Sequence, residues 1–92
     1  MSRGRLQVFF SGHVQGVGFR YTVRALAPGF EIVGKVRNLP DGRVELVAEG
    51  ATEELQAFLQ AVRESGLEPM IQREEVHWGE ASGEFRGFEI VG

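Results

Sequence analysis

Residues 12–20 read Gly-His-Val-Gln-Gly-Val-Gly-Phe-Arg and lie between two different patterns of apolar residues. Before them, residues 6–11 alternate with the period of two that predicts a strand. After them, apolar residues recur at helical spacing from Phe19 to Ala27, and Pro28-Gly29 ends the predicted helix. The glycine-rich segment is therefore a loop that leads from a strand into a helix.

Two more strands follow, joined by a tight turn. Residues 30–38 and 43–49 each alternate as strands do. Between them, the segment Leu39-Pro-Asp-Gly42 has proline and glycine at positions that a type I turn prefers. The pattern predicts an antiparallel hairpin.

The second half of the chain adds one helix and two strands. Thr52 is the expected N-cap of a helix whose apolar stripe ends before Gly66. Residues 71–78 and 85–91 are typical of further strands, and the second of them has the clearer pattern. The order is β-α-β-β-α-β with an extra short strand near the end. We expect an α+β fold, a ferredoxin-like split βαβ sandwich whose antiparallel sheet carries two helices on one face.

Length and composition narrow the class of protein. The chain has 92 residues, which predicts one domain over residues 1–92. It has no cysteine, which excludes disulfides, thiolate chemistry and a zinc ribbon. No apolar run has the length of a membrane span, and residues 1–5 lead straight into a strand. We expect a cytoplasmic monomer without a membrane partner.

Charge is unevenly distributed along the chain, whose net charge is −3. Residues 1–50 hold seven basic and four acidic side chains, whereas residues 51–92 hold three basic and nine acidic ones. The basic half contains the glycine-rich loop, which suits a small anionic substrate. A nucleic-acid partner would usually need a basic domain, so we expect none.

The loop has the chemistry of a phosphate site. Glycines at positions 12, 16 and 18 let the backbone come close to a ligand, so that successive N–H groups converge on one anion. The helix after the loop adds its unpaired N–H groups and the positive end of its dipole. Arg20 adds a planar cation that matches phosphate geometry. A glycine-rich loop alone is more typical of a simple turn, and the adjoining Arg20 is what favours a phosphate site. The spacing fits neither a Walker A loop nor a dinucleotide fingerprint.

Two segments carry a resemblance to a known family. The first is residues 12–20, and the second is Gly34-Lys-Val-Arg-Asn-Leu-Pro-Asp-Gly42, followed by Val44 and Gly50. Both resemble the motifs of the acylphosphatase family, small enzymes that hydrolyse the carboxyl–phosphate bond of acyl phosphates. With the length and the element order, the resemblance covers essentially the whole chain. It implies an acyl phosphate substrate and hydrolysis to a carboxylate and inorganic phosphate.

The resemblance also implies roles for individual residues. Arg20 is the expected phosphate-binding arginine, and Asn38 is the expected residue that orients the attacking water. The phosphate-binding backbone is expected to consist of Gln15, Gly16, Val17, Gly18 and Phe19. Lys35 stands where the family usually has an aromatic residue, which bears on contacts with the acyl group or on packing next to Asn38. We also expect the last strand to bring the carboxylate of Gly92 close to Arg20.

The residues that are missing point to the same reaction. The sequence has no aspartate cluster for magnesium, no paired histidines at ligand spacing and no cysteine nucleophile. An acyl phosphate expels a carboxylate whose conjugate acid has a pKa of about 4, so the reaction needs no general acid. Backbone amides and one arginine supply the positioning and charge that phosphoryl transfer needs. Asn38 is no base, so we expect a phosphate oxygen to accept the proton of the water. No metal and no cofactor are expected.

Three alternatives remain at this point. Arg86-Gly87-Phe88 resembles the start of an RNA-recognition motif, but the match breaks at Glu89 and Ile90, and the chain is acidic. A non-catalytic phosphate-binding module of the same fold would keep the loop without turnover. The chain could also be a fragment related to the acylphosphatase-like domain of larger carbamoyl-transfer proteins, although its length leaves no room for their other domains.

Overall fold

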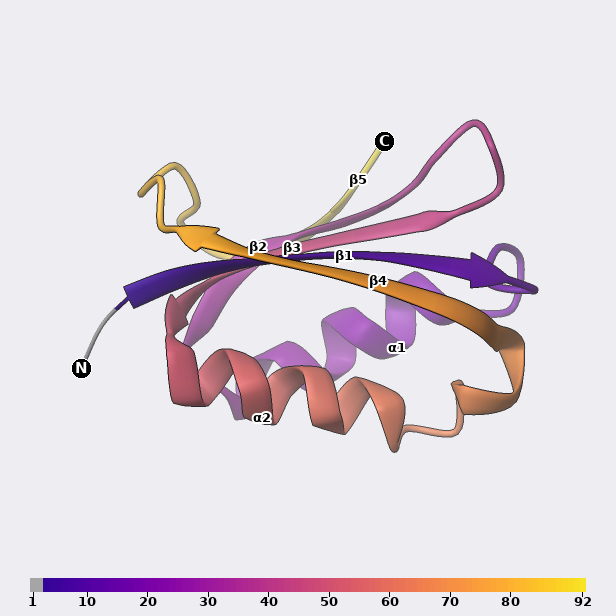
Figure 1. Ribbon diagram of the computed structural model, residues 1–92, viewed down its shortest axis with the longest axis horizontal. Helices are drawn as coiled ribbons and strands as arrows, with labels where there is room; N and C mark the ends of the chain where they lie inside the picture. The colour runs from indigo at the N-terminus through magenta and orange to yellow at the C-terminus, as the bar shows by residue number, and fades with distance from the viewer. Residues whose placement is uncertain (1–2) are drawn as a thin grey trace.

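Five strands form one sheet, and two helices cover one of its faces (Figure 1). The computed structural model describes residues 3–92, so residues 1–2 of the predicted domain lie outside the described part of the chain. The elements are, in chain order, β1 (Arg3–Gly12), α1 (Phe19–Leu26), β2 (Ile32–Asn38), β3 (Val44–Ala51), α2 (Thr52–Arg63), β4 (Ile71–Glu80) and β5 (Phe88–Val91), with short 3₁₀ turns at Ala27–Gly29 and Glu68–Met70. In the sheet the strands lie in the order β4-β1-β3-β2-β5.

This arrangement confirms the predicted α+β, ferredoxin-like fold with both helices on one face. One detail of the prediction is wrong, because the sheet is mixed rather than antiparallel. Strand β5 pairs in parallel with β2, with Phe88 opposite Gly34, whereas the other neighbouring strands pair antiparallel. After β4 the chain reverses its direction and reaches the opposite edge of the sheet. Strand β5 therefore runs in the same direction as its neighbour β2.

The core lies between the sheet and the helices. The alternating residues of β1 that face the helices are fully buried, as are the corresponding residues of β3. The predicted stripe of α2 is buried as well, and it consists of Leu55, Phe58, Leu59 and Val62. The ring of Phe58 packs against those of Phe30 and Phe88, with centroids 5.5 and 5.7 Å apart. Burial of each such side chain stabilises the fold by roughly 1.5–3 kcal/mol, so this layer fixes the helices on the sheet.

Two local predictions differ from the structure. The N-cap of α2 is Ala51, and Thr52 is the first helical residue, because β3 runs into α2 without an intervening loop. Of the predicted strand 85–91, only Phe88–Val91 is a strand. Residues 81–87 form a loop that lies over β3. At the end of this loop, the carbonyl oxygen of Gly87 accepts a hydrogen bond from the N–H of Gly34.

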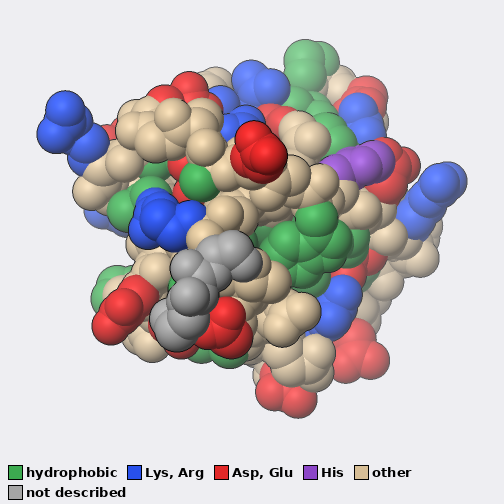
Figure 2. Space-filling view, turned by 60° about the vertical axis from the view of Figure 1, so that its left-hand side comes forward, with side chains coloured by type: hydrophobic (Ala, Val, Ile, Leu, Met, Phe, Trp, Pro, Cys, Tyr) green, Lys and Arg blue, Asp and Glu red, His purple; other side chains and the backbone are tan. Residues whose placement is uncertain are grey.

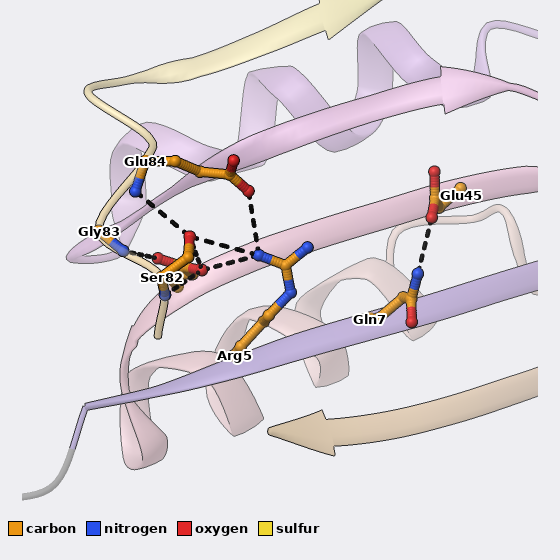
Figure 3. Close-up of polar contacts among 7 residues, drawn as sticks. Arg5, Gln7, Glu45, Ser82, Gly83 and Glu84 are labelled. Atoms are coloured by element: carbon orange, nitrogen blue, oxygen red, sulfur yellow. Dashed lines mark hydrogen bonds and ion pairs between the residues drawn. The ribbon is translucent and has the colours of Figure 1, made fainter. Parts of the chain in front are cut away.

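A buried carboxylate fastens this loop to the sheet. Glu49, on the β3 face opposite the helices, accepts hydrogen bonds from the N–H and Oγ of Ser82, both at 2.8 Å, and from the N–H of Gly83 at 3.0 Å. Its Oε2 lies 2.9 Å from Nη1 of Arg5, which also reaches Glu84 (Figure 3). Burial alone would raise the pKa of Glu49, but the hydrogen bonds from Ser82, Gly83 and Arg5 outweigh it and lower the pKa from 4.5 to about 2.

This low pKa predicts a loss of stability in acid. The pKa of Glu49 is lower in the folded chain, so its contribution is complete above pH 4.5 and disappears as the pH falls towards 2. The shift corresponds to about 3 kcal/mol at neutral pH. We expect Glu49→Gln to lower the free energy of unfolding in urea by about this amount at pH 7, and the difference from wild type to shrink as the pH falls from 4.5 to 2.

The matched control is Glu84→Gln, because Glu84 contacts the same arginine but is exposed. We expect this variant to change the free energy of unfolding by less than about 1 kcal/mol. A Glu49→Gln difference that stays constant over the acid range would show that the carboxylate of Glu49 is not the group that titrates.

The fold also mixes the charges that the sequence separates. Acidic and basic side chains are interspersed on the face that Figure 2 shows. Strand β1 from the basic half lies between β3 and β4, and ion pairs join the halves, as between Arg5 and Glu84. Neither helix within residues 3–92 has the length and apolar character that a membrane span needs.

Candidate active site

The loop between β1 and α1 turns at two glycines with left-handed backbone. The φ angle is +78° at Gly16 and +77° at Gly18. A Cβ added at either position would meet no atom within 4 Å, so backbone strain rather than crowding favours glycine there. Gly18 is also the N-cap of α1. The loop therefore leads directly into the first, unpaired N–H groups of that helix.

The first turn of α1 combines an apolar anchor with a cation. Phe19 is buried and packs against Phe10 of β1, with ring centroids 5.0 Å apart. The next residue, Arg20, is half-buried, and its guanidinium makes no hydrogen bond or ion pair with the described residues. The first turn of α1 contains no acidic residue. The guanidinium of Arg20 is therefore free to bind an anion.

The end of β2 brings Asn38 to the same place. Its Oδ1 is buried and accepts no hydrogen bond, and within residues 3–92 it is the single buried side-chain N or O atom in this condition. Leaving a buried acceptor without a partner costs about 1–3 kcal/mol of folding free energy, so such acceptors are few in native proteins. A functional role for Asn38 explains why this one is kept. The neighbouring cation, Arg37, points to the other face of the sheet, where its Nε lies 2.6 Å from Oε1 of Glu45. Because Arg37 is paired with Glu45, Arg20 is the cation that lies beside Asn38 in the pocket.

Glu45 is itself buried and also accepts a hydrogen bond from Nε2 of Gln7 at 2.7 Å (Figure 3). Burial would raise its pKa, but the bonds from Gln7 and Arg37 lower it overall. Glu45 thus stays ionised and keeps Arg37 away from the pocket.

These parts meet in one pocket of about 250 Å³. Its walls are formed by the loop, the first turn of α1 and the end of β2, through Val14, Gly16, Gly18, Phe19, Arg20, Tyr21 and Asn38. The pocket thus joins backbone amides, one unpaired guanidinium and one unpaired amide oxygen. This set can hold a tetrahedral anion and a water molecule, and the described residues that line it include no histidine and no carboxylate side chain.

Comparison with known proteins identifies the family to which the chain belongs. The family model described as Acylphosphatase matches residues 6–90. The acylphosphatase of Acaryochloris marina is 43% identical over 86 residues, which cover 94% of this chain and 91% of that protein. The chain belongs to the acylphosphatase family. It is a hydrolase of acid anhydrides, and its substrates are small acyl phosphates.

Solved structures agree with this assignment. The acylphosphatase from Bacillus subtilis has a TM-score of 0.87 and 35% identity, covering 97% of this chain and 99% of that one. Full-length HypF in its phosphate- and nucleotide-bound form has a TM-score of 0.82 at 28% identity. The match covers 99% of this chain but only 12% of HypF, so a domain of the acylphosphatase fold also occurs inside a much longer protein.

The pocket contains most of the predicted acylphosphatase site. Arg20, Asn38, Gly16, Gly18 and Phe19 line it, whereas Gln15 and Val17 do not. Two other expectations concern residues that do not line the pocket, Lys35 and Gly92. Lys35 lies on the sheet face opposite the helices, with its Nζ 6.0 Å from the ring centroid of Phe85. Gly92 lies beside Arg37 and Asn38, and within the described residues no ion pair joins it to Arg20.

Sequence reasoning missed the side chain of Gln15 and the position of Tyr21. The Nε2 of Gln15 donates to the carbonyl oxygens of Leu39 and Arg43, at 2.8 and 2.9 Å. It thereby ties the glycine loop to the hairpin that carries Asn38. Tyr21 lines the same pocket from α1. Neither residue carried a signal, because a glutamine or tyrosine beside a motif is compatible with many orientations.

Proposed function

We propose that the pocket is the catalytic site of this acylphosphatase, and that the reaction needs no metal ion. The phosphoryl group is held by backbone N–H groups of residues 15–19 and by the guanidinium of Arg20. Asn38 orients the water molecule that attacks phosphorus. The observation that carries the proposal is the meeting of two unpaired groups, Arg20 and Oδ1 of Asn38, in one pocket with the two left-handed glycines.

The chemistry follows from this arrangement. Oδ1 of Asn38 accepts one O–H of the water, which turns a lone pair of the water oxygen towards phosphorus. The new P–O bond forms as the bond between phosphorus and the acyl oxygen breaks, and the electron pair leaves with the carboxylate. A phosphate oxygen takes the second proton of the water. Charge on the equatorial oxygens is stabilised by the amides and by Arg20, which is the main requirement of phosphoryl transfer.

The remaining expectations about assembly belong to the same proposal. We propose that residues 1–92 act as one domain, as a cytoplasmic monomer, on free small molecules and without a nucleic-acid or membrane partner. The net charge of −3 and the interspersed surface charges support this reading. Light scattering during gel filtration measures the mass directly.

Benzoyl phosphate hydrolysis in the presence of EDTA tests the central claim. We expect the purified protein to release benzoate and inorganic phosphate at the same rate with and without the chelator. Within residues 3–92, no group of three or more histidine, aspartate or glutamate side chains is placed to hold a metal ion, which supports this expectation. A rate that falls to the uncatalysed value in EDTA, and returns on addition of magnesium, would contradict the proposal. Phosphate binding without turnover would identify a non-catalytic binding module instead.

A further inference from the structure

An exposed aromatic side chain stands beside the pocket. Three large hydrophobic side chains within the described residues are exposed, namely Tyr21 at 66%, Trp78 at 49% and Val17 at 41%. Single exposed hydrophobic residues are common and need no explanation. Here, however, Tyr21 lines the pocket, and Val17 lies between the lining residues Gly16 and Gly18. Two of the three therefore flank the candidate site.

The size and lining of the pocket indicate which part of the substrate contacts Tyr21 and Val17. Sites that enclose a whole small molecule usually have volumes from about 300 Å³ upwards. This pocket has about 250 Å³ and is lined by backbone, a guanidinium and an amide, which suit the phosphoryl group. When the phosphoryl group lies against this polar lining, the acyl group that is bonded to it meets the remaining lining residues, which include Tyr21.

The direction of the reaction places the acyl group away from Asn38. The attacking water and the leaving oxygen lie on opposite sides of phosphorus in phosphoryl transfer. Because Asn38 on β2 is proposed to hold the water, the acyl group leaves along a wall that another element forms. Tyr21 belongs to α1, where it directly follows the phosphate-binding Arg20, and it lines the pocket. Its side chain is therefore placed to contact the acyl group.

We propose that Tyr21, with Val17, binds the acyl group of the substrate and makes the enzyme prefer acyl phosphates that carry an aromatic ring or another large apolar group. This inference rests on the proposed function of the pocket. The tyrosine ring offers a flat apolar surface with only two rotatable bonds, so little conformational entropy is lost when a substrate ring packs on it. Because the ring is mostly exposed, its removal leaves the core unchanged.

The test compares benzoyl phosphate with acetyl phosphate, which differ in the ring but share the phosphoryl group. We expect Tyr21→Ala to lower the ratio of kcat/KM for benzoyl phosphate to kcat/KM for acetyl phosphate by about tenfold, through KM. Tyr21→Phe keeps the ring and should keep the ratio of the wild type. Trp78→Ala removes another exposed aromatic residue, which lies on β4 opposite Leu6 and does not line the pocket, and should leave the ratio unchanged.

Inhibition by non-hydrolysable analogues gives a second readout that needs no turnover. Phenacylphosphonate and acetonylphosphonate replace the bridging oxygen by a methylene group and differ in the ring alone. We expect Tyr21→Ala to weaken inhibition by the phenacyl compound selectively. If the ratio and the selectivity both stay as in wild type, Tyr21 does not bind the acyl group. Loss of the acyl preference is distinct from failure of the proposed site, which would show as full activity in variants of Arg20 or Asn38.

Discussion

Replacing Asn38 with alanine should lower kcat for benzoyl phosphate roughly a hundredfold to a thousandfold. The reason is that Oδ1 of Asn38 is the unpaired acceptor that we assign to the attacking water. Without it, the water reaches phosphorus with no fixed orientation, and the chemical step slows while the phosphate site stays intact. Steady-state kinetics over pH 5–8 measure the loss in kcat.

The affinity for inorganic phosphate separates this role from a structural one. We expect the inhibition constant of phosphate for Asn38→Ala to stay within about threefold of wild type, since the loop and Arg20 are untouched. The folded state should be stabilised or unchanged, because the substitution removes a buried polar atom that lacks a partner. If kcat falls and the melting temperature falls as well, Asn38 has a structural role instead. If kcat stays at the wild-type value, Asn38 does not orient the attacking water.

The parts of the site that the sequence predicts are those that depend on local chain geometry. The loop must turn where glycines allow positive φ, and Arg20 must follow it in the first turn of α1. The hairpin turn after Asn38 is equally local, and the structure confirms it with the hydrogen bond from the N–H of Gly42 to the carbonyl of Leu39. Element order then brings Asn38 to the loop, because β2 and α1 belong to the same βαβ unit.

The parts that were missed depend on contacts between distant segments. Glu49 falls on the face of β3 that alternation alone would leave exposed, but the loop around Ser82 covers it. The hydrogen bonds of Gln15 form only after the hairpin has docked against the loop. The parallel pairing of β5 follows from the side of the sheet on which the chain returns after β4. No local pattern in the sequence specifies any of these three.

The second large effect is expected at Arg20. Its guanidinium is the cation of the pocket, and it has no partner among the described residues. Arginines that stabilise the transition state of phosphoryl transfer contribute factors of about a thousand or more to the rate. We therefore expect Arg20→Ala to lower kcat/KM for benzoyl phosphate at least about a thousandfold, and to weaken inhibition by inorganic phosphate by about tenfold to a hundredfold.

Two further variants decide whether the planar cation itself is needed. Arg20→Lys keeps the charge but loses the bidentate fork, so we expect it to recover phosphate binding in part while most of the rate remains lost. Arg24→Ala removes an exposed arginine one turn further along α1, and should leave both constants close to wild type. If Arg24→Ala impairs the enzyme as strongly as Arg20→Ala, the helix acts through its total charge. If Arg20→Lys is fully active, the fork has no role, and a point charge above the loop amides is sufficient.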